Sequence, residues 1–192
     1  ELRARLQRGE PAAPEVLEAW GAAAEAAPQD PGSRLCWDFA KGSCPRGKKC
    51  RYLHLEGEAA GYVFLCSSGT QPDCGAFRLL GSPARELEQM RHCIRPETQL
   101  FLLNFETLKL LGPFSAASEP EADLSREAFS GKFSAQIRAE ALELPLMEAT
   151  LEGRIKAGPK SAAEVEELQA WLQAGQAAPE YVQDAWQMEE AT

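Results

Sequence analysis

The sequence predicts an α+β protein, and three observations lead to that fold class. Three cysteines and one histidine fall within the nineteen residues 36–54. Apolar runs of strand-like length, bounded by turn residues and interleaved with short helical patterns, follow between residues 60 and 152. A helical pattern then begins at Pro159. We therefore expect a small metal-stabilised module, a mainly antiparallel sheet domain with short helices, and a helical C-terminal tail.

The metal-stabilised module is predicted from ligand spacing. Cys36, Cys44, Cys50 and His54 follow the pattern C-x7-C-x5-C-x3-H. Three thiolates and one imidazole make a complete tetrahedral ligand set for zinc. A segment this short cannot bury enough apolar surface to fold alone, and zinc binding contributes roughly 10–16 kcal/mol to the folding of such peptides. We predict one structural Zn²⁺.

Basic and aromatic side chains occupy the positions between these ligands. From Arg34 to His54 there are six Lys/Arg and one acid, a net charge of +5. The whole chain carries −9, so the remainder carries −14. Trp37, Phe39 and Tyr52 lie in this cationic segment. Because Lys and Arg contact phosphates and aromatic rings stack on bases, the pattern is typical of single-stranded nucleic-acid binding.

Residues 34–55 resemble a CCCH-type zinc finger, and we place this domain at 32–56. Most members of that family bind single-stranded RNA, although some single fingers are structural or bind proteins. The family has one aromatic between the first two cysteines and another between the third cysteine and the histidine, which Phe39 and Tyr52 match. The resemblance and the charge pattern predict RNA contacts by Trp37, Phe39, Lys41, Arg46, Lys48, Lys49, Arg51 and Tyr52.

The number of cysteines and the length of the apolar runs indicate the cellular compartment. Zinc accounts for three of the six cysteines, and the remaining three are an odd number, which favours a reducing compartment, the nucleus and/or the cytoplasm. The apolar runs are far shorter than the roughly 18 residues that span a bilayer, so no membrane is expected. Glu1 is not an initiator Met, so we expect a fragment. The Ala/Glu/Pro-rich segment 1–31 is expected to be helical or flexible.

Periodicity and turn residues predict the elements of the central domain. The predicted strands are 61–66, 99–105, 107–112 and 133–140, and the predicted helical segments are 72–79 and 84–92.

The stretch from about 60 to 152 resembles the DCD (development and cell death) domain, a family known mainly from plants and green algae. Its signatures FGLP, LFLF, PAQV and PLxE have counterparts in order at Leu80–Pro83, Leu100–Leu103, Ser134–Ile137 and Pro145–Glu148. The substitutions within them are conservative, apart from the smaller Ser82. The resemblance implies a role in stress, hormone or cell-death responses. It implies no known enzymatic activity, and we expect neither catalysis nor a small-molecule substrate.

Several signature residues have a physical interpretation. Gly81 and Pro83 are expected to shape a turn. Gln136 either contacts a ligand or satisfies buried backbone groups. Glu148 is expected to cap or pair at a helix start.

The tail, 159–192, carries clear helix signals. Ser161 and Glu164 form a capping box, Val165, Leu168 and Leu172 form an apolar stripe, and Gly175 is a stop signal. A second short helix follows Pro179. These helices either pack on the preceding domain, which is the favoured interpretation, or bind a partner.

Three further patterns in the sequence are weaker. The segment 153–161 is close to a phosphate-binding loop, but Pro159 removes an N–H that such a loop needs. Cys66, Cys74, His92 and Cys93 could form a second metal site, although core thiols are favoured. A modified-base reader with an aromatic cage is a minority hypothesis, because all four Trp lie outside 60–152.

Together these observations predict a non-enzymatic, zinc-dependent RNA-binding protein coupled to stress or cell-death signalling. The DCD-like domain would recruit a protein or recognise a feature of the RNA. The alternative is a protein–protein interaction adaptor whose zinc finger is purely structural.

Overall fold

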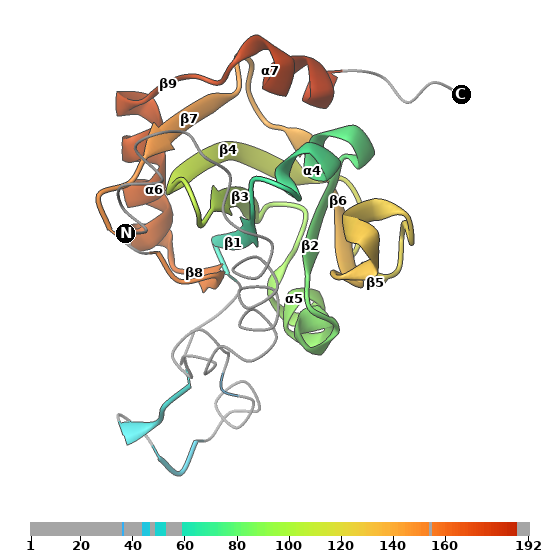
Figure 1. Cartoon of the computed structure of the whole chain (residues 1–192). Helices are drawn as coiled ribbons and strands as arrows, with labels where there is room; N and C mark the ends of the chain where they lie inside the picture. The colour runs from blue at the N-terminus through green and yellow to red at the C-terminus, as the bar shows by residue number, and fades with distance from the viewer. Residues whose placement is uncertain (1–35, 37–43, 47–48, 53–58, 154, 188–192) are drawn as a thin grey trace, which may run out of the picture. The chain divides into compact units, whose positions relative to one another are not determined.

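The computed structural model of the chain describes residues 36, 44–46, 49–52, 59–153 and 155–187 (Figure 1). The predicted segment 1–31 lies outside them. The strands are β1 Gly61–Cys66, β2 Leu79–Ser82, β3 Gln99–Asn104, β4 Lys109–Ala116, β5 Glu121–Ala122, β6 Ala135–Ala141, β7 Met147–Thr150, β8 Gly158–Lys160 and β9 Gln176–Ala177. The helices are α4 Gln71–Phe77, α5 Leu87–Cys93, α6 Ala162–Ala174 and α7 Glu180–Gln187, with 3-10 turns η3 Ala84–Glu86 and η4 Ala128–Gly131. The predicted α+β class is confirmed.

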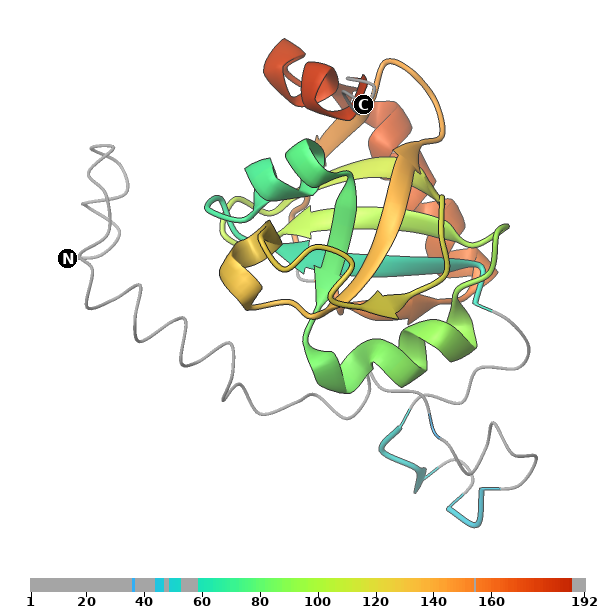
Figure 2. The ribbon, with the colours of Figure 1, turned by 90° about the vertical axis from the view of Figure 1, so that its right-hand side faces the viewer.

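The strands form one mixed sheet in the order β2-β6-β4-β3-β1-β8. The β1–β3 pair is parallel, and every other pairing among the described strands is antiparallel. Strand β4 changes its edge partner along its length, since residues 109–112 pair with β7 and residues 114–116 pair with β6. This change of partner accompanies the curl of the sheet into a half-barrel (Figure 2).

Both faces of the central strands are buried, which explains their continuous apolar sequences. In β1, Tyr62 and Phe64 belong to one apolar cluster, whereas Val63 belongs to another. Strand β3 alternates in the same way, with Leu100 in the first cluster and Phe101 in the second. Since successive side chains of a strand point to opposite faces, a strand covered on both sides must be apolar at nearly every position.

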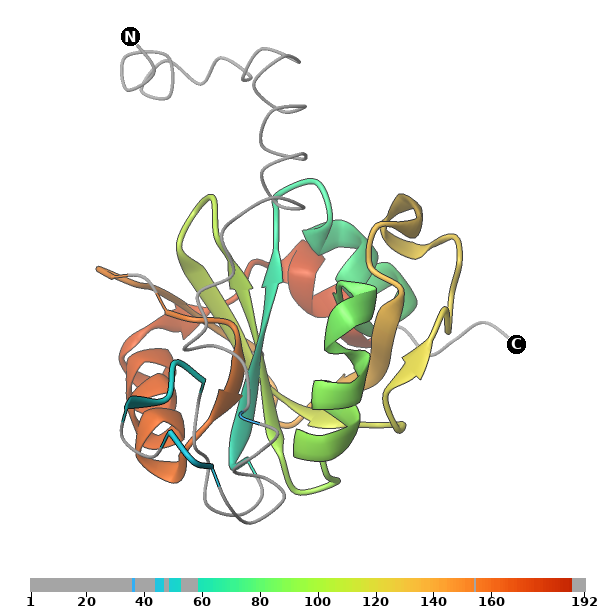
Figure 3. The same cartoon turned by 90° about the horizontal axis from the view of Figure 1, so that it is seen from below.

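Helices cover the two faces of the sheet. Figure 3 shows α5 and α6 on opposite sides of it. Helix α6 begins at the predicted capping box and buries Val165, Leu168 and Leu172 against the second cluster. Helix α7 buries Val182 and Trp186 in the first cluster. The predicted packing of both helices on the preceding domain is confirmed. Among the described helices, none has the length and apolar character needed to cross a bilayer.

One predicted segment changes type along its length. The sequence predicts a helix over 72–79, but α4 ends at Phe77 and Arg78 caps it in the left-handed region, with φ 49°. Strand β2 begins at Leu79 and includes Gly81, so the turn predicted at Gly81 is wrong. A Cβ at Gly81 would lie 2.8 Å from both Phe129 Cε2 and Phe133 Cβ. Gly81 is therefore needed for close packing across β2 and not for a turn.

Candidate metal centre and nucleic-acid interface

Three of the four predicted zinc ligands come together. The Sγ atoms of Cys36, Cys44 and Cys50 all lie within 4.8 Å of one another, and those of Cys36 and Cys50 are 3.6 Å apart. Two thiolates on one tetrahedral zinc, each with a Zn–S bond of about 2.3 Å, are separated by about 3.8 Å. A disulfide would need about 2.05 Å. The cluster therefore fits a zinc ion held by separate thiolates, and the fourth predicted ligand, His54, lies outside the described residues.

The backbone between the ligands is a short turn. The Lys49 N–H donates to the Arg46 carbonyl oxygen at 3.0 Å, which closes the chain between Cys44 and Cys50. Cys36 is buried, and Cys44 and Cys50 are half-buried. Thiols gathered this closely are typical of a structural metal site.

Exposed cations and an aromatic ring lie beside the cysteines in the sequence. Arg46, Lys49 and Arg51 are exposed, and Tyr52 is 38 % exposed. The Arg46 Cζ lies 5.7 Å from the centroid of the Tyr52 ring, within the range of a cation–π contact. The structure thus brings together an aromatic face and a guanidinium from the predicted RNA-binding set. The other predicted contacts, Trp37, Phe39, Lys41 and Lys48, lie outside the described residues.

The remaining cysteines are core thiols. Cys66, Cys74 and Cys93 are buried in the first apolar cluster. A side-chain hydrogen bond with Cys74, together with burial, raises the pKa of the Cys66 thiol. Burial raises the pKa of Cys93 to about 11, and the charge of Arg95 offsets part of that rise. Because metal ligation needs the thiolate, these environments favour core packing over a second metal site. Among the described residues, the Cys36–Cys44–Cys50 group is the metal-type cluster found.

The two polar signature residues of the domain are structural. Gln136 is buried, and all its hydrogen bonds go to the backbone of residues 125 and 133. It follows the second of its two predicted roles. The helix-start role predicted for Glu148 is wrong, because Glu148 lies in β7. Its Oε1 accepts from Lys109 Nζ at 2.9 Å and from Gln176 Nε2 at 3.0 Å. The sequence could not reveal these partners, since 39 and 28 residues separate them from Glu148.

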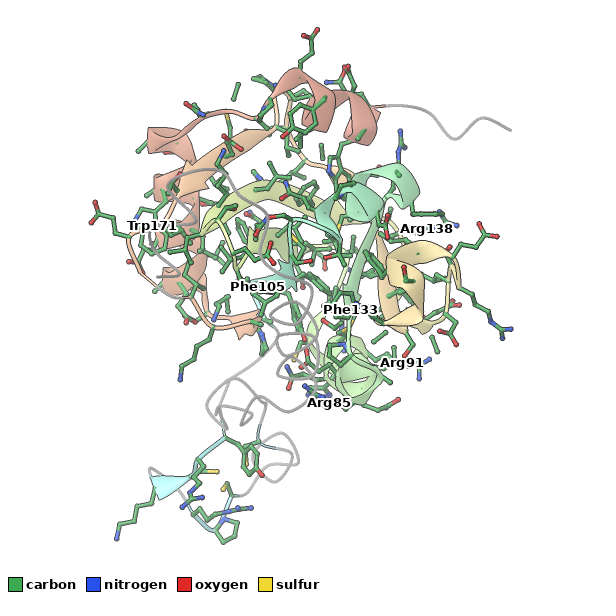
Figure 4. The ribbon with its side chains drawn as sticks, in the orientation of Figure 1. Arg85, Arg91, Phe105, Phe133, Arg138 and Trp171 are labelled. Atoms are coloured by element: carbon green, nitrogen blue, oxygen red, sulfur yellow. The ribbon has the colours of Figure 1, made fainter. Side chains whose placement is uncertain are left out.

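Two arginines that the sequence interpretation did not single out also come together. Arg91 and Arg95 both line a groove at the C-terminal end of α5. Figure 4 labels Arg91 on that helix. Arg95 lies beyond the end of α5, so helical spacing gave no signal for this pair, and the groove forms only because residues 116–120 lie beside the end of the helix.

A cysteine-ligand module and an α+β domain with a curled mixed sheet define a two-part class of protein, a zinc finger joined to a sheet domain. The chain belongs to the development and cell death domain family, whose model matches residues 60–173. A CCCH-type zinc finger model matches residues 34–54. Neither match is to a family of enzymes.

Curated relatives are plant proteins with the same domain. The DCD domain-containing protein NRP of Arabidopsis thaliana is 35 % identical over 86 residues, which cover 41 % of this chain and 24 % of that protein. The B2 protein of Daucus carota is 34 % identical over 85 residues, which cover 41 % of each. The chain thus spans less than half the length of these relatives.

Solved structures with a similar arrangement are YTH domains. The Mmi1 YTH domain in complex with RNA has a TM-score of 0.48 and 8 % identity, and the match covers 61 % of this chain and 79 % of that one. The YTH domain of the Zygosaccharomyces rouxii MRB1 protein in complex with N6-methyladenosine RNA has a TM-score of 0.45 and 9 % identity, and covers 62 % and 91 %.

Proposed function

We propose that this chain is a non-enzymatic, zinc-dependent RNA-binding protein whose finger contacts single-stranded RNA. The observation that carries the proposal is the exposed set Arg46, Lys49, Arg51 and Tyr52 next to the cysteine ligands, in a chain of net charge −9. Local positive charge in an acidic protein favours a polyanionic ligand. An exposed ring beside that charge supports stacking on an unpaired base.

The role of zinc in this proposal is structural. Cys36, Cys44, Cys50 and His54 would hold the ion, which would fix the loops that carry the RNA-contacting side chains. The basic side chains would contact phosphates, and Tyr52, with Phe39 and Trp37, would stack on bases.

The domain at 60–173 is proposed to connect this binding to stress or cell-death signalling, in the nucleus and/or the cytoplasm. Support comes from the family match and from the curated DCD relatives. It would act by recruiting a protein or by recognising a feature of the RNA. An adaptor with a purely structural finger is the alternative function.

A salt titration tests the RNA proposal. The zinc-loaded chain is mixed with a random pool of single-stranded RNA, and binding is measured by fluorescence anisotropy. Four or five phosphate contacts would give a slope of log K against log salt of about −3, at about −0.7 per contact. Absence of binding at low salt would sink the proposal and leave the adaptor function.

Tyr52→Ala separates stacking from folding of the finger. Because base stacking contributes about 1–3 kcal/mol per base, we expect this variant to bind RNA roughly 5- to 150-fold more weakly while zinc stoichiometry is unchanged. Tyr181→Ala is the matched control, since Tyr181 is 75 % exposed on α7. Loss of zinc in Tyr52→Ala would mean that the ring holds the finger together. Crosslinking of bound RNA in cells, with His54→Ala as the zinc-site control, would then give the RNA sequence.

A further inference from the structure

A groove of about 490 Å³ lies between the end of α5 and the connection from β4 to β5. One wall is formed by Arg91, Ile94, Arg95 and Pro96, and the other by residues 116–120. Its size falls within the range of about 300–1,000 Å³ that ligand sites occupy. Apart from the two arginines, Ser118 and Glu119, the lining side chains are apolar.

The guanidinium groups in this groove are held in place by backbone carbonyl groups and by Glu88. Arg91 Nε donates to the Pro120 carbonyl oxygen at 3.2 Å, and its Nη1 donates to Glu88 Oε1 at 3.0 Å. Arg95 Nη1 donates to the carbonyl oxygens of Arg91 at 2.8 Å and Ile94 at 3.0 Å. Among the described residues, no protein group accepts from Arg91 Nη2. A fixed guanidinium with donors to spare is well suited to a phosphate.

The groove is less acidic than the domain around it. From residue 59 to residue 187 there are eleven Lys/Arg and eighteen Asp/Glu. The groove has two arginines and one acid, Glu119, in its lining, and Glu88 pairs with Arg91 from outside the lining. The groove therefore carries no net negative charge, so an anionic ligand meets less repulsion there than over the rest of the acidic domain.

The groove is also close to the point where the chain arrives from the zinc finger. The Thr98 hydroxyl donates to the Ala59 carbonyl oxygen at 3.1 Å and accepts from the Arg95 N–H at 2.9 Å. The Gln99 N–H donates to the Ala60 carbonyl oxygen at 3.0 Å. Only residues 55–58 separate His54 from Ala59. At about 3.6 Å per residue, the Cα of His54 lies no further than about 18 Å from that of Ala59.

We infer that this groove is a second contact for the same single-stranded RNA that the finger binds, with Arg91 and Arg95 donating to its phosphates. The inference rests on the proposed function and names the part of the domain that takes part in it. A nucleotide fits this groove better than an acidic peptide does, because it combines phosphates with a flat apolar surface that can lie between Pro96 on one wall and Ala117 on the other. The short linker of residues 55–58 keeps both contacts within reach of one RNA strand. Binding at either contact therefore raises the effective concentration of the RNA at the other.

The experiment compares short and long random-sequence RNA, of about 5 and about 20 nucleotides, because single-strand sites take about 4–16 nucleotides. The proteins are the zinc-loaded wild type, Arg91→Ala, Arg91→Lys and Arg126→Ala. Arg126 is an exposed arginine outside the groove lining and serves as the charge-matched control. Arg91→Ala should fold normally, since the Arg91 side chain is 49 % exposed, and a thermal melt checks this.

The expected result is a loss of RNA affinity in Arg91→Ala that depends on the length of the RNA. Arg91→Ala should weaken binding of the long RNA about fivefold at 0.1 M salt and reduce the magnitude of the salt slope by about 0.7, the value for one phosphate contact. Arg91→Ala should bind short RNA with unchanged affinity. Arg91→Lys should retain most of the wild-type affinity for long RNA, and Arg126→Ala should bind both RNAs as wild type does. Crosslinks from 4-thiouridine RNA should map to residues 91–96 or 116–120 as well as to the finger.

Other results would overturn the inference. If Arg91→Ala binds long RNA with the affinity of wild type, the groove is not an RNA contact. The same follows if Arg126→Ala loses as much affinity for long RNA as Arg91→Ala does. In both cases the proposal for the finger stands. An acidic peptide pool that binds in an Arg91-dependent way, with no RNA crosslink in the groove, would assign the groove to a protein ligand. If wild type binds neither RNA, the proposed function itself fails and this inference fails with it.

Discussion

Gln136 illustrates how one buried side chain holds a loop whose backbone is unfavourable. Its exposed fraction is 1 %. Its Oε1 accepts from the Ser125 N–H at 2.7 Å, and its Nε2 donates to the carbonyl oxygens of Ser125 and Phe133 at 2.9 and 2.8 Å. The loop it holds contains Phe129 and Ser130 in the left-handed region, with φ of 58° and 51°. Such residues cost about 1–3 kcal/mol each and persist where surrounding contacts fix them.

Gln136→Ala should therefore lower the free energy of unfolding by about 2–4 kcal/mol, because it leaves three polar backbone groups without their partner. Urea denaturation measures this. Gln173→Ala is the matched control, since Gln173 is exposed on α6, and should change stability by less than about 0.5 kcal/mol. Equal stability of the two variants would contradict the structural role of Gln136.

Cys93 makes stability depend on pH in the alkaline range. Burial raises its pKa from about 9 to about 11, so the folded state keeps a proton that the unfolded state loses. This contribution is fully present below pH 9 and is lost as the pH rises from 9 to 11, for a total of about 3 kcal/mol. Denaturation of wild type and Cys93→Ala across this range checks it. The free energy of unfolding should fall more steeply with pH for wild type than for Cys93→Ala. Parallel curves for the two proteins would contradict a buried neutral thiol at Cys93.

At the scale of elements, α7 is an integral part of the core. Trp186 is 5 % exposed, and its ring centroid lies 4.4 Å from that of Phe114 in β4. Helix α7 also approaches α4 closely, because a Cβ at Gly75 would lie 2.8 Å from the Ala185 Cβ. The helix nearest the C-terminus thus closes the face of the sheet that α4 and α5 also cover.

Trp186→Ala should lower the free energy of unfolding by about 3–5 kcal/mol, the usual cost of removing a large buried aromatic. Tyr181→Ala, on the exposed side of the same helix, should change it by less than about 0.5 kcal/mol. Chemical denaturation of both variants gives the comparison. Similar small losses would show that α7 is only loosely docked.

At the scale of the whole molecule, the metal-ligand module and the sheet domain depend on different stabilising forces. The described cysteine cluster involves Cys36, Cys44 and Cys50, whereas the two apolar clusters of the sheet domain are made of residues from 59 to 186. A module without its own core depends on its metal, and a domain with two apolar clusters does not.

Removal of zinc with a chelator should therefore abolish RNA binding and leave the main cooperative thermal transition within a few degrees of its original midpoint. Circular dichroism measures the transition and anisotropy measures the binding. Added zinc should restore binding. Loss of the main transition on chelation would show that the sheet domain needs the metal as well.

The sequence predicted what local patterns encode. The strands β1, β3 and β4 were found from apolar runs, β6 from its alternating pattern, and α6 from its capping box and stripe, because these signals lie within a few neighbouring residues. The short strands β2, β5, β7, β8 and β9 were missed. Each has two to four residues and is a strand only because a partner lies beside it. The turn predicted at Gly81 and the helix cap predicted for Glu148 were wrong for the same reason. The contact partner that explains each residue, Phe129 for Gly81 and Lys109 for Glu148, is distant in sequence.

The amino-acid sequence by itself determined the zinc-ligand spacing, the cationic character of the finger, the α+β class and the family, since all of these are properties of residue type and order. Only the tertiary structure decided how β4 divides between β6 and β7, what Gln136 holds, and that Arg91 and Arg95 line one groove with residues 116–120. The physical reason is distance along the chain. Hydrogen bonds and packing between different segments of the chain leave no periodic trace in either segment, so they appear only when the fold brings the segments together.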